Sequence, residues 1–130
     1  GSSKIEGVLE YGEIPKKSGL WLMDAPSYTP ESLTGFSSAG SQICLFSTGS
    51  GNCYSSDLMP TLRITANPET ALRLRHQIDH DCSDLINNGN FEKAENKLLE
   101  DLVSVLSGKL CYGEILGDGG ETISRFGEAL

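Results

Sequence analysis

The sequence predicts an α/β fold, a three-layer, Rossmann-like sandwich with a short, mostly parallel sheet flanked by helices. Segments of strand length occur at 20–23, 42–46 and 62–66, the first of them an apolar run, and two segments between or after them begin with a proline-based helix start. A long amphipathic segment follows at 91–106. Strands that alternate with helices are typical of a parallel sheet with crossover helices.

The N-terminal part contains two short apolar segments. Between Lys4 and Lys17 a small apolar patch predicts a turn of helix or a docking arm. Its apolar residues are Ile5, Val8, Leu9 and Tyr11. Leu20–Met23 is a four-residue apolar run after Gly19, and its length favours a buried strand over a helix. Asp24-Ala25-Pro26 then ends the run.

A helix start signal and a second strand follow. Thr29 is placed to cap the free amides, Pro30 suits the first helical position, and Glu31 faces the positive end of the helix dipole. Gly40 can end this helix. The segment 42–46 is uniformly apolar from Ile43 to Phe46, which predicts a second buried strand. Together the segments predict a right-handed βαβ unit whose two polar turns open on one edge of the sheet.

The second half repeats these signals. After the strand at 62–66, Asn67-Pro68-Glu69 offers a cap, a proline and an acid, and apolar spacing up to Ile78 predicts a helix of about three turns. The segment 91–106 carries its apolar residues on one stripe and predicts the clearest helix, packed on the core or, alternatively, presenting a partner groove. Alternation at 122–126 predicts an edge strand.

Size and charge bound the class of protein. With 130 residues we expect one domain, 4–130, preceded at 1–3 by an expression-tag remnant. The net charge of −8 argues against a nucleic-acid partner. No apolar run reaches the roughly 18 to 20 residues of a membrane helix, so we expect no membrane partner and a cytoplasmic location. The four cysteines lack a C-x-x-C pair, and we expect free thiols.

Two polar turns follow the predicted strands and are candidate sites. Asp24 is placed to act as a general base or metal ligand, although a turn before Ala25-Pro26 also explains it. Ser47, Thr48, Gly49, Ser50 and Gly51 form a glycine-rich turn whose amides could hold a carboxylate or a phosphate. The turn lacks the lysine and the spacing of a Walker loop.

The run from His76 to Cys82 raises a metal hypothesis. His76 and His80 are four residues apart, and on a helix they would share one face and could hold a metal ion. A helix end rich in polar caps explains the same residues. A Ser-His-Asp hydrolase is conceivable from the residue types, but no G-x-S-x-G motif is present.

Several segments, in order and spacing, resemble one family. They are Gly19-Leu20-Trp21-Leu22-Met23-Asp24-Ala25-Pro26, Ser32-Leu33-Thr34-Gly35, Ala39-Gly40, Gln42-Ile43, Phe46-Ser47-Thr48-Gly49-Ser50-Gly51, Ala66-Asn67-Pro68-Glu69-Thr70 and Ile78-Asp79. This series resembles the C-terminal region of the altronate and galactarate dehydratase family, and the resemblance runs from about Gly7 to Gly127. Sulfolactate sulfo-lyase has a large subunit similar to the same family.

The resemblance implies a lyase that removes water from a sugar acid with a divalent metal, Fe²⁺ or Mn²⁺. It implies a substrate carboxylate at Ser47–Gly51, with Asp24, Tyr28 and Asp79 as candidates for proton transfer or its support. It also implies that the chain works with N-terminal and central regions of a longer protein and is inactive alone. The sequence leaves open whether the protein forms a homo-oligomer.

The sequence also departs from the family pattern. Ser50 stands where the family usually has an arginine, which removes a bidentate carboxylate clamp. The residues after Asp79 differ too, so the resemblance does not account for the two histidines. Elimination of sulfite instead of water, a different substrate, or a non-catalytic binding or assembly domain therefore remain alternatives.

Overall fold

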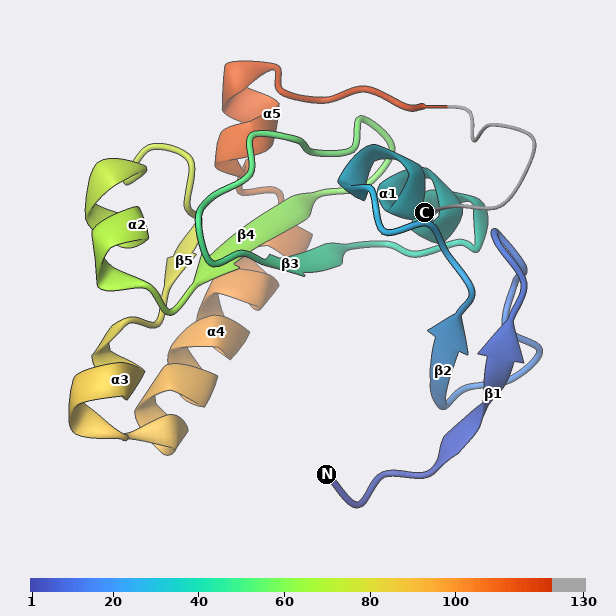
Figure 1. The fold of residues 1–130 in the computed structure, drawn as a ribbon, viewed down its shortest axis with the longest axis horizontal. Helices are drawn as coiled ribbons and strands as arrows, with labels where there is room; N and C mark the ends of the chain where they lie inside the picture. The colour runs from blue at the N-terminus through green and yellow to red at the C-terminus, as the bar shows by residue number, and fades with distance from the viewer. Residues whose placement is uncertain (123–130) are drawn as a thin grey trace.

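The computed structural model describes residues 1–122, and within them the chain forms two small parallel sheets flanked by helices (Figure 1). The α/β class is confirmed. The elements, in chain order, are β1 Ile5–Leu9, β2 Leu20–Met23, α1 Thr29–Ser38, β3 Cys44–Ser47, β4 Thr61–Thr65, α2 Pro68–Arg73, β5 His80–Asp81, α3 Asp84–Asn88, α4 Phe91–Leu106 and α5 Tyr112–Leu116. None of the described helices is both long and apolar enough to cross a membrane.

The smaller sheet pairs β1 with β2. The two strands are parallel, with Ile5 opposite Leu20 and Leu9 opposite Met23. The first apolar patch is therefore a strand, and the predicted turn of helix is wrong. Leu20 and Leu22 remain about half exposed, at 49% and 50%, so the expectation that β2 is buried is also wrong. A two-stranded sheet covers β2 along its hydrogen-bonding edge but leaves these side chains open.

The larger sheet has the order β3-β4-β5, with all strands parallel. Central β4 is the most buried strand, with Thr61, Leu62 and Arg63 at 1% exposure or less. Because β2 and β3 lie in different sheets, the predicted βαβ unit is wrong. The N–H of Asp24 instead continues the smaller sheet by donating to the backbone oxygen of Leu9 at 2.9 Å.

Helix α1 begins at Thr29, one residue earlier than expected. Tyr28 occupies the cap position without a side-chain hydrogen bond, so the prediction of a Thr29 cap is wrong. The Thr29 hydroxyl accepts a hydrogen bond from the Asn52 side chain at 3.1 Å. Proline in the first turn and the acidic Glu31 match the expected start, and Leu33 packs into the core at 2% exposure.

Helix α2 is capped as predicted but is shorter. The Asn67 side-chain oxygen accepts hydrogen bonds from the amides of Glu69 and Thr70, which satisfies two free donors of the first turn. The predicted three turns are wrong, because the helix ends at Arg73 and Leu74 leaves the helical region with φ −113° and ψ 33°. Ile78 lies directly after the turn that follows the helix, and its side chain is buried.

Helix α4 matches its prediction and closes one face of the larger sheet (Figure 1). Its Val105 forms a buried cluster with Leu62 and Cys111, and Leu98 packs against that cluster. The N-terminal end of the stripe is not covered, since Phe91 is 73% exposed. Of the edge strand expected at 122–126, all but the first residue lies outside the described part of the chain.

All four cysteines are free thiols in very different surroundings. Burial raises the pKa of the Cys44 thiol to about 11. Burial, reinforced by the nearby Asp79 and Glu114 carboxylates, raises the pKa of the Cys111 thiol to about 12. Cys53 is exposed. Since the thiolate is the reactive form, the buried cysteines should be inert in the folded chain.

We therefore expect iodoacetamide at about pH 8 to modify Cys53 well before Cys44 and Cys111. Mass spectrometry of peptides after a timed reaction measures the order. The same reaction in denaturant is the control, and there all four thiols should react at similar rates. Modification of native Cys111 as fast as Cys53 would contradict the packing around it.

Candidate functional site

A groove lies at the carboxyl edge of the larger sheet, where β3, β4 and β5 end. It has a volume of about 520 Å³ and is lined by Ser47, Thr48, Gly49, Ile64, Ala66, Asn67, Pro68, Cys82 and Ile86. In open α/β sheets this edge is the usual place for a ligand. The predicted glycine-rich turn therefore lies on the groove, but the turn with Asp24 does not.

The start of the glycine-rich turn is fixed by the neighbouring strand. The Thr48 N–H donates to the backbone oxygen of Ile64 at 2.9 Å, and the Thr48 oxygen accepts from the Thr65 hydroxyl at 2.7 Å. The Gly51 N–H donates to the Thr48 hydroxyl at 3.0 Å. These bonds tie the start of the turn to β4 and to its own glycine end.

Helix α2 holds the next two carbonyl groups of the turn. The Gly49 oxygen accepts hydrogen bonds from the Thr70 hydroxyl at 2.7 Å and from the Asn67 amide at 3.2 Å. The Ser50 oxygen accepts from the Arg73 guanidinium at 2.9 Å. Within residues 1–122, the N–H groups of Gly49 and Ser50 have no acceptor. A turn whose carbonyls are held on one side and whose amides are free can bind an anion.

Sequence reasoning missed most of the residues that hold this turn. Asn67 was expected only as a helix cap, and Thr65, Thr70 and Arg73 were not singled out. Their contacts with the turn span 17 to 23 residues of sequence. The one available signal was the polar cluster at the start of α2, directly after a predicted strand.

Asp24 and Tyr28 lie outside the groove. Asp24 is exposed after β2, and Tyr28 is 52% exposed before α1. Both belong to the segment between the smaller sheet and α1, and neither lines the groove. Their proposed roles in proton transfer remain predictions.

Asp79 lies at the opposite end of β5 and has both carboxylate oxygens engaged. One oxygen accepts from the Arg63 N–H at 2.9 Å, and the other accepts from the Tyr112 N–H at 2.7 Å. Its carboxylate therefore links β4 to the start of α5. This geometry gives Asp79 a supporting position, and a catalytic role for it remains a prediction.

A buried arginine completes this support. Arg63 is fully buried, and its Nη1 lies 3.2 Å from Asp118 Oδ2 and 3.1 Å from the backbone oxygen of Asn52. Its Nε lies 3.9 Å from Asp79 Oδ2. The network joins β4 to the loop after β3 and to the segment after α5, so it fixes the frame that carries the groove.

The hypothesis that His76 and His80 share one helix face and hold a metal ion there is wrong. His76 lies in an exposed turn after α2 and stacks edge-on against Tyr112 at a ring distance of 6.4 Å. His80 lies in β5 and is buried. In the part of the chain that the structure describes, no three His, Cys, Asp or Glu side chains gather where they could hold a metal ion. The described residues of this chain therefore do not fit the divalent metal that the resemblance implies.

The chain matches one protein family over almost its whole length. Residues 1–128 match the family described as D-galactarate/altronate dehydratase, C-terminal. The (2R)-sulfolactate sulfo-lyase subunit beta of Chromohalobacter salexigens is 32% identical over 97% of this chain, which spans 33% of that protein.

Two altronate dehydratases are similar over a slightly smaller part. The Escherichia coli K12 protein is 35% identical and the Bacillus subtilis 168 protein 32% identical, each over 88% of this chain. The chain spans 23% of the length of each of them. With the family match extending over almost every residue, this chain belongs to the D-galactarate/altronate dehydratase family and corresponds to its C-terminal domain.

Proposed function

We propose that this chain is the C-terminal, substrate-binding domain of a sugar-acid dehydratase, which eliminates water from an altronate- or galactarate-like acid. Family membership and the two altronate dehydratase relatives support the reaction class. The single observation that carries the binding role is the turn Ser47–Gly51, which borders the groove, has its carbonyls held by β4 and α2, and has two N–H groups without an acceptor within residues 1–122.

The substrate carboxylate is proposed to bind at the free N–H groups of Gly49 and Ser50. Arg73 adds positive charge at this turn, because its Nη2 lies 2.9 Å from the Ser50 oxygen. The cation that the resemblance expects at position 50 is thus supplied from α2. A guanidinium has further donors, so Arg73 can hold the turn and still bind a carboxylate.

Elimination next to a carboxylate needs a base for the α-proton, positive charge for the enediolate and an acid for the leaving group. In this proposal Arg73 and the turn supply positive charge and orientation. Asp24 and Tyr28 are candidates for proton transfer in the assembled protein, and Asp79 positions the sheet. The divalent metal, proposed as Fe²⁺ or Mn²⁺, is assigned to the rest of a longer protein, so the isolated domain is expected to be inactive.

Replacing Arg73 with alanine in that longer protein should raise KM for a sugar acid about ten- to hundredfold, with a smaller effect on kcat. The reason is the loss of a charge-assisted contact to the carboxylate. Steady-state kinetics with altronate and galactarate in the presence of Fe²⁺ or Mn²⁺ measures the effect. Arg75→Ala is the matched control, because Arg75 is exposed and bonds to His76 away from the groove.

Equal kinetics for the Arg73→Ala and Arg75→Ala proteins would contradict the binding role. A longer protein inert towards every aldonate and aldarate would contradict the dehydratase assignment. Ser50→Arg should lower KM if the turn binds substrate, whereas a non-catalytic assembly domain would show no change in any substrate measurement.

A sulfo-lyase is the second candidate function, because the sulfo-lyase subunit matches 97% of the chain. It uses the same carboxylate contact and differs in the leaving group, sulfite in place of water. The longer protein incubated with (2R)-sulfolactate distinguishes the two, since release of sulfite without dehydration of sugar acids would favour this alternative.

A further inference from the structure

The buried His80 and the partly exposed Asp101 form a pair that the proposed carboxylate site does not use. The His80 side chain is 2% exposed, and its Nδ1 lies 2.9 Å from Asp101 Oδ2. Lys97 Nζ lies 3.1 Å from the same oxygen, and Lys109 Nζ lies 3.8 Å from the other. Burial raises the pKa of Asp101, but hydrogen bonds from His80 and Lys97 outweigh it and hold that pKa below its usual value.

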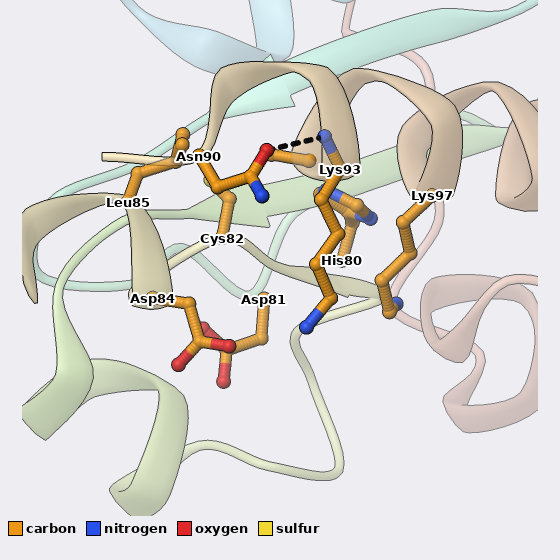
Figure 2. A pocket seen from close by; sticks show the side chains of 9 residues that line it. His80, Asp81, Cys82, Asp84, Leu85, Asn90, Lys93 and Lys97 are labelled. Carbon is orange, nitrogen blue, oxygen red and sulfur yellow. Dashed lines mark hydrogen bonds between the residues drawn. The ribbon is translucent and has the colours of Figure 1, made fainter. Parts of the chain in front are cut away.

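The pair borders a pocket of about 240 Å³ between β5, α3 and α4 (Figure 2). With Nδ1 engaged by Asp101, Nε2 is the ring nitrogen left for a ligand, and it has no partner among the residues that the structure describes. Nε2 is not among the buried polar atoms that lack a partner, so it is accessible from the pocket. His80 lines the pocket, so a ligand there can bind Nε2.

The pocket is lined by both cations and carboxylates. In Figure 2 the Asp81 and Asp84 carboxylates lie together, and the Lys93 amino group lies between Asp81 and Lys97. Cations and an imidazole suit a carboxylate, whereas carboxylates accept hydrogen bonds from hydroxyl groups. A small acid that carries hydroxyl groups therefore finds partners for both kinds of group in this pocket.

We propose that this pocket is a second binding site, for a short hydroxy acid, in which binding is coupled to protonation of His80. The ligand carboxylate is bound by His80 Nε2–H, Lys93 and Lys97, and its hydroxyl groups donate to Asp81 and Asp84. The imidazolium donates Nδ1–H to Asp101. The proposal is independent of the lyase activity, because binding and proton uptake occur without turnover.

Several other ionisable groups surround His80 and enter the pH dependence. They are Asp101, Lys93 and Lys97 on α4, Asp81 and Cys82 on or after β5, Asp84 on α3 and, through Asp101, Lys109, while Arg63 on β4 is held by Asp118. Desolvation, reinforced by Asp81, raises the pKa of the Cys82 thiol, which therefore stays protonated at neutral pH. Anion binding that takes up a proton weakens as pH rises, by at most about tenfold per pH unit for one proton.

Isothermal titration of the 130-residue chain with glycerate, acetate and glycerol tests the site. Glycerate should bind about tenfold more tightly than acetate because of its hydroxyl groups, and glycerol should not bind. Repeating the glycerate titration in buffers of different ionisation enthalpy should reveal uptake of up to about one proton. No binding of glycerate, equal affinity for acetate, or binding without proton uptake would each overturn the proposal.

Two variants and a control locate the site. His80→Gln should retain a donor but abolish proton uptake, and Lys93→Gln should weaken glycerate binding about fivefold. Lys93 is exposed, so its variant remains informative if the buried His80→Gln variant fails to fold. Lys4→Gln removes the same charge far from the pocket and should bind normally. A Lys93→Gln protein that binds as tightly as Lys4→Gln would overturn the assignment.

Discussion

Replacing Asp118 with alanine is expected to lower the free energy of unfolding by about 3 kcal/mol. Arg63 is fully buried, and its Nη1 and Nη2 lie 3.2 Å and 3.3 Å from the same Asp118 oxygen. Removing one partner of a buried ion pair costs about 3 to 5 kcal/mol, because the other charge stays buried without compensation. The lower end applies here, since the Asp118 side chain is 24% exposed and Arg63 keeps its bond to Asn52.

Urea unfolding followed by circular dichroism measures this loss. Glu95→Ala is the matched control, because it removes a carboxylate from an exposed position of α4 and should change stability by less than about 0.5 kcal/mol. Asp118→Asn keeps an acceptor and should fall between the two. A loss below about 1 kcal/mol for Asp118→Ala would contradict the view that this pair holds the sheet to the segment after α5.

The sequence predicted those elements whose signals are local. The amphipathic repeat of α4 and the Asn67 cap of α2 both act within a few residues, and both were found. The length of α2 was not, because the helix pattern continues to Ile78 although the chain turns at Leu74. Ile78 is buried although it lies beyond the helix. Its spacing from the apolar residues of α2 is nevertheless the spacing that one more helical turn would give.

Strand pairing and strand burial could not be predicted because they depend on distant partners. The edge of β2 is taken by β1, a segment whose own strand character was missed, and β3 instead joins β4. An apolar strand was expected to be buried, yet Leu45 is 48% exposed. An apolar side chain can be buried, but the neighbouring elements decide whether it is.

The candidate site was predicted in the same partial way. The turn at Ser47–Gly51 was found from its glycines and its place after a strand, but the side chains that hold its carbonyls come from β4 and α2. The His80–Asp101 pair spans 21 residues and has no local signal. The spacing of His76 and His80 was interpreted on a helix that ends before either residue, so the metal hypothesis began from the wrong local structure.

Replacing Gly51 with alanine is expected to have the largest effect on the candidate substrate site. Gly51 has a φ of +100°, and an added Cβ would lie 2.2 Å from Leu74 Cδ1 and 3.8 Å from Thr70 Cγ2. The backbone strain of a non-glycine residue there costs about 1 to 2 kcal/mol, and displacing Leu74 adds to it. We expect a loss of about 2 to 3 kcal/mol in the free energy of unfolding.

The function of the turn should suffer as well, because Thr70 is one of the two side chains that hold the Gly49 oxygen. A shift of the turn moves the free amides away from the substrate carboxylate, and a misplacement of about 1 Å can cost about a hundredfold in rate. Urea unfolding of the chain and sugar-acid kinetics of the longer protein measure the two effects separately.

Two other glycines separate backbone strain from the clash. Gly40 has a φ of +88° with nothing within 4 Å of an added Cβ, so Gly40→Ala should cost only the strain, about 1 kcal/mol. Gly49 has no such φ and equally open surroundings, so Gly49→Ala should be nearly neutral in stability. If Gly51→Ala matches Gly40→Ala in both stability and KM, contact with α2 does not set the position of the turn. A larger loss at Gly51 in both measurements means that α2, through Thr70 and Leu74, holds the anion-binding amides in place.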